Sequence, residues 1–171
     1  TAPGITMGSS DEHYIFYAFK SPATVVVRMS LRYYHNSFQL KAETFTDGST
    51  WSSTSWYNIT DAPHSIELEW KAATAAGAKN GTLRVRIDGV DKQTVTKLDS
   101  DTILVDYAEL GAVDGIDTGT RGSYYFDSFS SNRSQPWAVG DSVSKTISYT
   151  YDPLYRLTAA DGTDSTTFHY T

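Results

Sequence analysis

Several features that decide function in other proteins are absent from this chain. It has no cysteine, which excludes a disulfide framework, a thiol nucleophile and a cysteine-based zinc site. No apolar run approaches the roughly 20 residues of a membrane-spanning helix, so we expect no membrane insertion. Lysine and arginine form no block in a chain of net charge −6, which argues against a nucleic-acid partner.

What remains is typical of an all-β protein. The 171 residues include 12 tyrosines and many serines and threonines, whereas helix-favouring runs are missing. The hydrophobic fraction of 39 % is sufficient for a core. This length suits one sandwich-sized domain followed by a tail.

A hairpin within residues 63–89 gives the clearest structural signal. Apolar and polar residues alternate in residues 66–71 and again in residues 82–87, which predicts two strands with one buried face each. The two polar faces carry opposite charges, on Glu67 and Glu69 in one strand and on Arg84 and Arg86 in the other. Antiparallel pairing would therefore form cross-strand ion pairs.

Further strands are predicted on both sides of this hairpin. They cover residues 12–19, 23–32, 38–43, 92–98, 103–113 and 123–131, and residues 51–59 form an edge strand or a loop. Short strands separated by turns at intervals of about 8–12 residues indicate an antiparallel β-sandwich. A parallel α/β sheet is disfavoured because no helical segments alternate with the strands.

Three segments resemble one fold family. His64 precedes Glu-Leu-Glu-Trp, residues 83–89 read Leu-Arg-Val-Arg-Ile-Asp-Gly, and residues 122–129 read Gly-Ser-Tyr-Tyr-Phe-Asp-Ser-Phe. This pattern resembles the concanavalin A-like (LamG-like, laminarinase-like) jelly-roll superfamily over residues 12–131. The resemblance implies an antiparallel jelly-roll sandwich over residues 1–133, closed by the strand at residues 123–131.

The composition changes after this domain. Residues 134–143 are expected to form a linker. Residues 144–171 resemble a partial YD (Rhs-type) repeat, because Tyr151-Asp152 and Arg156-Leu157 fit its core, although Tyr155 replaces the usual glycine. The resemblance implies a short β-strand tail and a fragment of a large bacterial surface or secreted protein, with extracellular localisation and the rest of that polypeptide as a partner.

Aromatic residues suggest a carbohydrate site. Sugar-binding modules stack exposed aromatic rings on sugar rings and surround them with polar groups. The candidates are Trp51, Trp56 and Tyr57 in a segment rich in serine and threonine, and the adjacent Tyr33 and Tyr34. The alternative is that these rings belong to the core or its rim.

Calcium binding is implied only by the jelly-roll resemblance. Asp127 occupies the place in the predicted closing strand from which that family takes a calcium ligand, and Glu12 would add a second carboxylate if the first strand lay beside the last. The alternative is that Asp127 hydrogen-bonds a neighbouring loop.

No catalytic arrangement is visible in the sequence. The Glu-x-Asp-x-x-Glu motif of laminarinase-like glycosidases is missing, and Glu67 and Glu69 are interpreted as a solvated strand face. The histidines show no metal or triad spacing, and His64 is expected to fix the entry to its strand. We therefore expect a non-catalytic, lectin-like recognition or adhesion module with a glycan or cell-surface ligand. The alternatives are a structural spacer or capping domain of a YD-repeat shell, and a carbohydrate-active enzyme.

Overall fold

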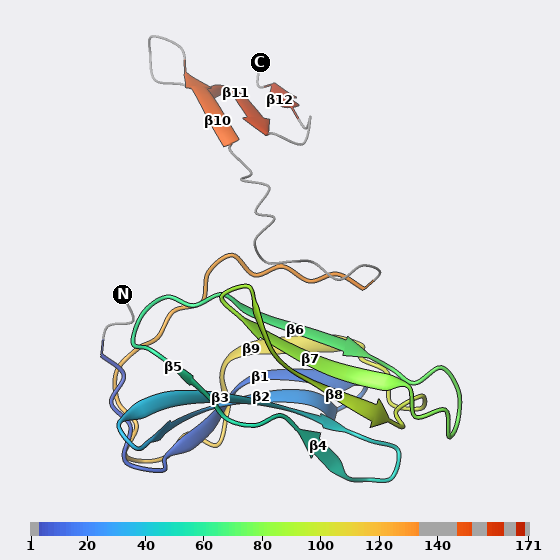
Figure 1. Ribbon diagram of the computed structural model, residues 1–171. Coiled ribbons are helices and arrows are strands. Elements are labelled where there is room, and N and C mark those ends of the chain that lie inside the picture. Colours follow the sequence, from blue (N-terminus) through green and yellow to red (C-terminus); the bar gives the residue numbers. More distant parts are fainter. Residues whose placement is uncertain (1–3, 134–146, 152–156, 163–166, 170–171) are drawn as a thin grey trace. The chain divides into compact units, whose positions relative to one another are not determined.

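The computed structural model describes residues 4–133, 147–151, 157–162 and 167–169 (Figure 1). The chain divides into two compact units, Thr1–Trp137 and Ala138–Thr171. Every extended element in the described residues is a β-strand, and the strands of each sheet pair antiparallel, as the sequence predicts. In this part of the chain there is no helix with the length and apolarity that a membrane crossing requires.

The first unit contains a large sheet of six strands in the order β4-β3-β2-β1-β9, with β5 also paired to β3. The strands are β1 (Glu12–Lys20), β2 (Thr24–Tyr34), β3 (Ser37–Phe45), β4 (Trp51–Ser53), β5 (Tyr57–Ile59) and β9 (Tyr107–Asp114). β2 and β3 join through a two-residue turn in which His35 and Asn36 have φ of 49° and 60°. Positive φ at both central residues matches the twist of the flanking strands, so this turn fixes their register.

The smaller sheet of this unit contains the predicted hairpin. Its strands are β6 (Ile66–Lys71), β7 (Gly81–Ile87) and β8 (Val90–Leu98), in that order. Glu67 lies opposite Arg86 and Glu69 lies opposite Arg84, and both pairs form ion pairs. The predicted alternation and charge pairing are therefore confirmed.

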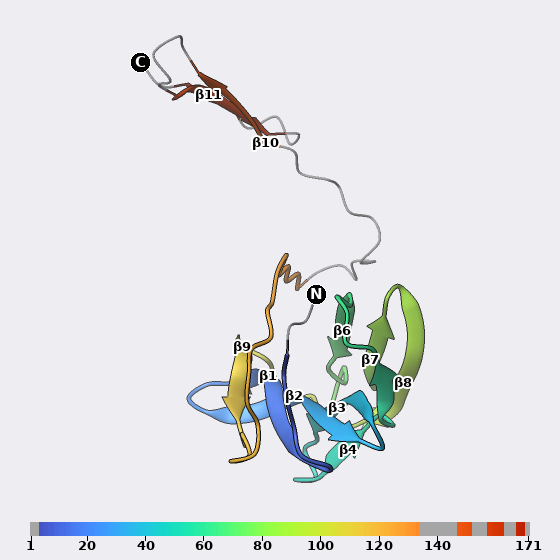
Figure 2. The ribbon, with the colours of Figure 1, turned by 90° about the vertical axis from the view of Figure 1, so that its left-hand side faces the viewer.

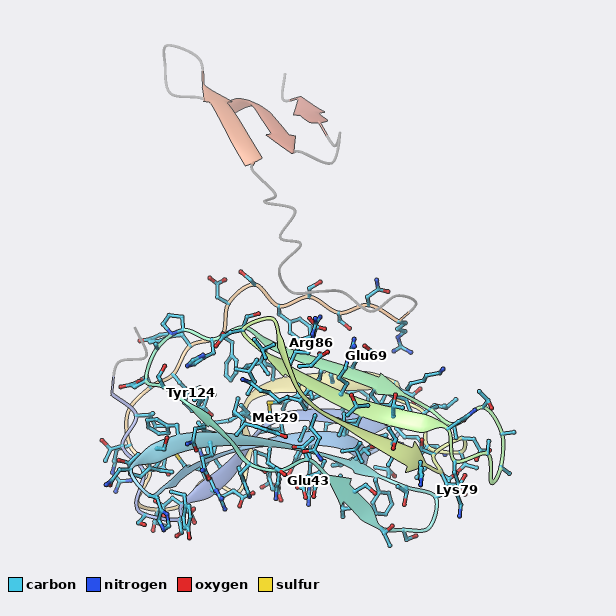
Figure 3. The ribbon with its side chains drawn as sticks, in the orientation of Figure 1. Met29, Glu43, Glu69, Lys79, Arg86 and Tyr124 are labelled. Carbon is cyan, nitrogen blue, oxygen red and sulfur yellow. The ribbon has the colours of Figure 1, made fainter. Side chains whose placement is uncertain are left out.

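The two sheets face each other and enclose the core (Figure 2). β2 contributes Val27, Met29 and Leu31, and Met29 lies between the two layers in Figure 3. β7 contributes Leu83, Val85 and Ile87, of which Leu83 is fully buried. Burial of these alternating side chains is the main source of stability because apolar surface leaves water on both sheets at once.

The predicted closing strand is wrong, because residues 123–131 form no strand. The edge of β1 that such a strand would need is occupied by β9, which pairs with β1 from Tyr107 to Asp114. The segment is attached instead through a bridge between Thr6 and Arg121 and through a hydrogen bond between Tyr124 Oη and His13 Nε2. The strand predicted at residues 103–113 also begins later, at Tyr107.

The second unit contains a separate antiparallel sheet in the order β10-β11-β12. Its strands are β10 (Ile147–Tyr151), β11 (Leu157–Gly162) and β12 (Thr167–His169). The predicted linker at residues 134–143 lies outside the described residues, as do Asp152, Tyr155 and Arg156 of the predicted repeat motif. The tail therefore contains β-strands, and its identity as a YD repeat remains a prediction.

Candidate ligand-binding face

The large sheet has a polar face, called the outer face here, that is turned away from β6, β7 and β8. Strand alternation creates it, because Val27, Met29 and Leu31 point into the core while the side chains between them point outward. Glu43 of β3 lies on this outer side in Figure 3, whereas Arg86 and Glu69 lie on the far side of the small sheet.

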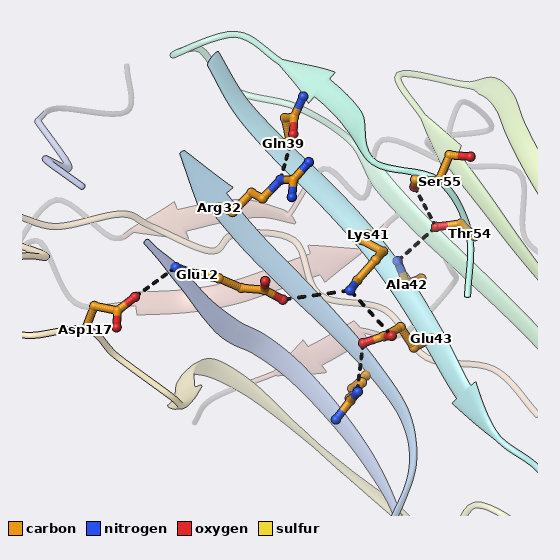
Figure 4. A network of polar contacts seen from close by, with 10 residues as sticks. Glu12, Arg32, Gln39, Lys41, Ala42, Glu43, Thr54, Ser55 and Asp117 are labelled. Atoms are coloured by element: carbon orange, nitrogen blue, oxygen red, sulfur yellow. Dashed lines mark hydrogen bonds and ion pairs between the residues drawn. The ribbon is translucent and has the colours of Figure 1, made fainter. Parts of the chain in front are cut away.

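An ion-pair network crosses the outer face (Figure 4). Lys41 Nζ lies 3.4 Å from Glu43 Oε1 and 3.9 Å from Glu12 Oε1. Arg28 Nε donates to Glu43 Oε2 at 2.8 Å. These ion pairs join β1, β2 and β3 and hold the long side chains of the network in place. Ser30 lies between Arg28 and Arg32 along β2 and is fully buried, and its Oγ has no hydrogen-bond partner among the described residues.

Aromatic rings cover the cations of this network. The Arg28 guanidinium carbon lies 3.8 Å from the centroid of Trp51. The Arg32 guanidinium carbon lies 3.9 Å from the centroid of Trp56, and Lys41 Nζ lies 4.6 Å from the same ring. Each cation–π contact stabilises this arrangement by about 0.5–2 kcal/mol, depending on its exposure. Both indoles are half-buried and are therefore held in defined positions.

A break in the edge strand places the second indole. The segment predicted as an edge strand or a loop is both, because β4 and β5 are separated by residues 54–56. At the break, Thr54 N donates to Ala42 O at 2.9 Å and Thr54 Oγ1 accepts from Ala42 N at 3.1 Å. Trp56 lies outside the regular strand at this point, where its ring contacts the cations of β2 and β3.

A row of amide and guanidinium groups extends the face across three strands. Arg32 of β2 lies opposite Gln39 of β3, which lies opposite Asn58 of β5. Arg32 Nε donates to Gln39 Oε1 at 2.7 Å, and Gln39 Nε2 donates to Asn58 Oδ1 at 2.6 Å. Asn58 is exposed at the end of the row, with its amide nitrogen directed away from this bond.

The structure separates the five predicted aromatic residues into two groups. Trp51, Trp56 and Tyr34 lie on the outer face. The guanidinium carbon of Arg32 lies 4.6 Å from the centroid of the Tyr34 ring. Tyr33 packs against the core and Phe38. Tyr57 also packs against the core, and its Oη donates toward Gln93 Oε1 of β8 at 2.9 Å. Tyr33 and Tyr57 therefore lie between the sheets, away from the outer face.

The two predicted calcium ligands are engaged separately. Asp127 is exposed, and its Oδ1 accepts from Ser128 N at 2.7 Å. Glu12 belongs to the Lys41 network, and its own amide donates to Asp117 Oδ2 at 2.9 Å. Neither residue belongs to a group of three metal-ligating side chains in the described part of the chain.

Three other carboxylates come together where loops of the two sheets meet. Asp47, Asp99 and Asp101 place oxygens within 4.8 Å of one another, as hard cations such as calcium require. Burial and the adjacent Asp47 raise the pKa of Asp101. Burial alone would raise the pKa of Asp47 as well, but hydrogen bonds from Thr102 and Asp101 outweigh this effect and lower the pKa of Asp47. The sequence does not predict this group because Asp47 is far in sequence from the other two carboxylates. The Asp-Ser-Asp run at residues 99–101 is the one local signal that could have indicated it.

A histidine network at the hairpin contains the residue types of an acid–base site. His64 Nδ1 lies 2.7 Å from Asp88 Oδ2, and His64 Nε2 lies 2.9 Å from Thr60 Oγ1. However, the Thr60 amide also donates to Nε2 at 3.1 Å, and Asp88 Oδ1 accepts from Ser65 N. These bonds tie the loop before β6 to the β7–β8 turn, which agrees with the strand-entry role expected for His64.

Comparison with known proteins gives no relative for this chain: no family model, no curated protein and no solved structure matches it.

Proposed function

We propose that the first unit is a non-catalytic, lectin-like domain that binds a glycan through the outer face of its large sheet. The observation that carries this proposal is the position of Trp51 and Trp56, whose rings lie on the outer face among charged and amide side chains. A sugar ring presents an apolar C–H face and a rim of hydroxyl groups. An indole ring beside hydrogen-bonding side chains is complementary to both.

The rigidity of the face supports this function. The cations beneath the indoles are themselves held by Glu43 and Gln39, so little side-chain freedom remains to be lost on binding. Pre-organisation of this kind reduces the entropic cost of association.

The wider context of the domain belongs to the same proposal. The sequence resemblances favour a concanavalin A-like jelly roll attached to YD repeats in a secreted or surface-exposed bacterial protein. Calcium binding is part of the proposal because the jelly-roll resemblance implies it. Asp47, Asp99 and Asp101 would supply three of the calcium ligands.

A structural capping role is the second candidate. This role is favoured because Glu43 already forms ion pairs with Arg28 and Lys41. Charged groups paired with one another in this way are expected on a face that binds no ligand. Catalysis is less well supported. Glu12 and Glu43 lie on the same face, but both engage the Lys41 ammonium and neither is placed as a proton donor.

A glycan-array screen tests the proposal. The full chain is applied in calcium and again in chelator, together with Trp56→Ala and the control Tyr125→Ala, which removes a 75 % exposed ring outside the outer face. We expect specific binding that Trp56→Ala weakens about tenfold or more and Tyr125→Ala leaves unchanged. Loss of binding in chelator would add calcium to the function. Absence of binding to any glycan would favour the capping role instead.

A further inference from the structure

Arg32 differs from the other arginines of the described residues in what its guanidinium contacts. Three strand arginines form ion pairs, namely Arg28 with Glu43, Arg84 with Glu69, and Arg86 with Glu67 and Asp91. Two loop arginines donate to backbone carbonyls, Arg121 to Thr118 and Thr120, and Arg133 to Val105 and Asp106. Within the described part of the chain, Arg32 has neither a carboxylate nor a backbone carbonyl as a partner, and its hydrogen bond goes to the side-chain amide of Gln39.

The position of this guanidinium is nevertheless fixed. Its Nε donates to Gln39 Oε1 at 2.7 Å, and its central carbon lies 4.6 Å from the Tyr34 ring centroid and 3.9 Å from that of Trp56. Glu12 lies opposite Arg32 in the β1–β2 register, but its carboxylate is directed to Lys41. The N–H groups on the two terminal nitrogens are therefore held in place, and none of the described residues gives them an anionic partner.

We propose that Arg32 binds the carboxylate of an acidic sugar, so that the glycan recognised by the outer face contains uronic acid. The inference rests on the proposed glycan-binding function and specifies its ligand class. A planar guanidinium presents two parallel N–H donors that match the two oxygens of a carboxylate, and this pairing is stronger than a neutral hydrogen bond.

The neighbouring groups fit the remainder of such a ligand. The Trp56 ring contacts Arg32 and is only half-buried, and in the proposed complex its exposed part would stack on the sugar. The Asn58 amide nitrogen lies at the far end of the Arg32–Gln39–Asn58 row and can donate to a hydroxyl. The chain as a whole carries a net charge of −6, so general electrostatic attraction does not favour anionic ligands and the selectivity must come from this local site.

The test compares three matched probes against the full chain: oligogalacturonate, its carboxyl-reduced neutral counterpart, and a sulfated galactan oligosaccharide. We expect oligogalacturonate to bind at least about tenfold more tightly than the neutral probe, with an affinity that falls as salt is added. Arg32→Gln should abolish the preference, and Arg32→Lys should reduce it because lysine lacks the planar fork. The control Arg84→Gln, on the other sheet, should leave it unchanged.

Each outcome has a separate meaning. Equal binding of the uronate and neutral probes would overturn the role of Arg32 and leave glycan binding in place. Preference for the sulfated probe over the uronate would overturn the carboxylate assignment. Absence of binding to every probe and to the glycan array would overturn the proposed function itself. If Arg32→Gln fails to fold, as judged by thermal unfolding, Arg32→Lys and the salt titration of the wild-type chain decide the question.

Discussion

Replacing Leu83 by alanine tests the packing between the two sheets. Leu83 lies in β7, the middle strand of the small sheet, and is fully buried in the core. Truncation removes buried apolar atoms and leaves a cavity that neighbouring side chains fill only in part. The expected loss is about 3–4 kcal/mol, a large share of the about 5–15 kcal/mol that stabilises a typical domain. In a unit of this size, such a loss lowers the melting temperature by on the order of 10 °C.

Urea unfolding followed by circular dichroism measures this loss directly. The matched control is Leu104→Ala, the same chemical change at a side chain that is 54 % exposed, for which we expect a change of no more than about 0.5 kcal/mol. Equal losses of unfolding free energy for Leu83→Ala and Leu104→Ala would refute the assignment of the core to the space between the sheets.

Three further predictions concern pH and ion pairing. Burial lowers the pKa of His13 below 6.5, so the unfolded state binds a proton on this side chain more readily than the folded state. The free energy of unfolding should therefore fall as pH drops below 6.5. Urea titrations should show a smaller fall for His13→Gln. The hydrogen bond from His64 lowers the pKa of Asp88 below 3.8, so its stabilising effect is present above pH 3.8 and is lost as pH falls through the folded-state pKa. Asp88→Asn should therefore cost at most about 1 kcal/mol at neutral pH and nothing in strong acid. A double-mutant cycle on Glu69 and Arg84 should give a coupling of about 0.5 kcal/mol, because both side chains are partly exposed. The His13 prediction would be contradicted by a free energy of unfolding that does not change with pH, and the Asp88 prediction by a loss of stability in Asp88→Asn that is the same at every pH. The ion-pair prediction would be contradicted if the effects of the Glu69 and Arg84 substitutions simply added.

The hairpin was predictable because its information is local. Alternation over residues 66–71 and 82–87 fixes which side chains are buried, and a shift of one residue would reverse every one of them. The facing charges of Glu67 and Arg86 agree with that register, so pattern and electrostatics lead to the same pairing.

The segment at residues 123–131 shows where local pattern fails. Its aromatic residues are typical of a strand, but β9 takes the place beside β1, and the segment pairs with no other strand of the described residues. Which of two segments pairs with an edge depends on the whole chain. The sequence pattern in one of them therefore cannot decide it.

The candidate site was predicted in part for the same reason. Trp51 and Trp56 were identified by residue type, yet the cations beneath them were visible only as polar positions of strands. Their contacts depend on the register of β2 with β3 and on the break between β4 and β5. The Asp47 group depends likewise on two loops that are distant in sequence.

The most direct test of glycan binding at the outer face is an NMR titration of the indole N–H signals with a glycan identified on the array. Trp70 serves as an internal control, because its Nε1 donates to Thr44 Oγ1 at 3.0 Å and its side chain packs against the core. Binding at the outer face predicts that the indole signals of Trp51 and Trp56 shift in proportion to saturation while that of Trp70 stays in place. Saturable binding that leaves the Trp51 and Trp56 signals unmoved would contradict it.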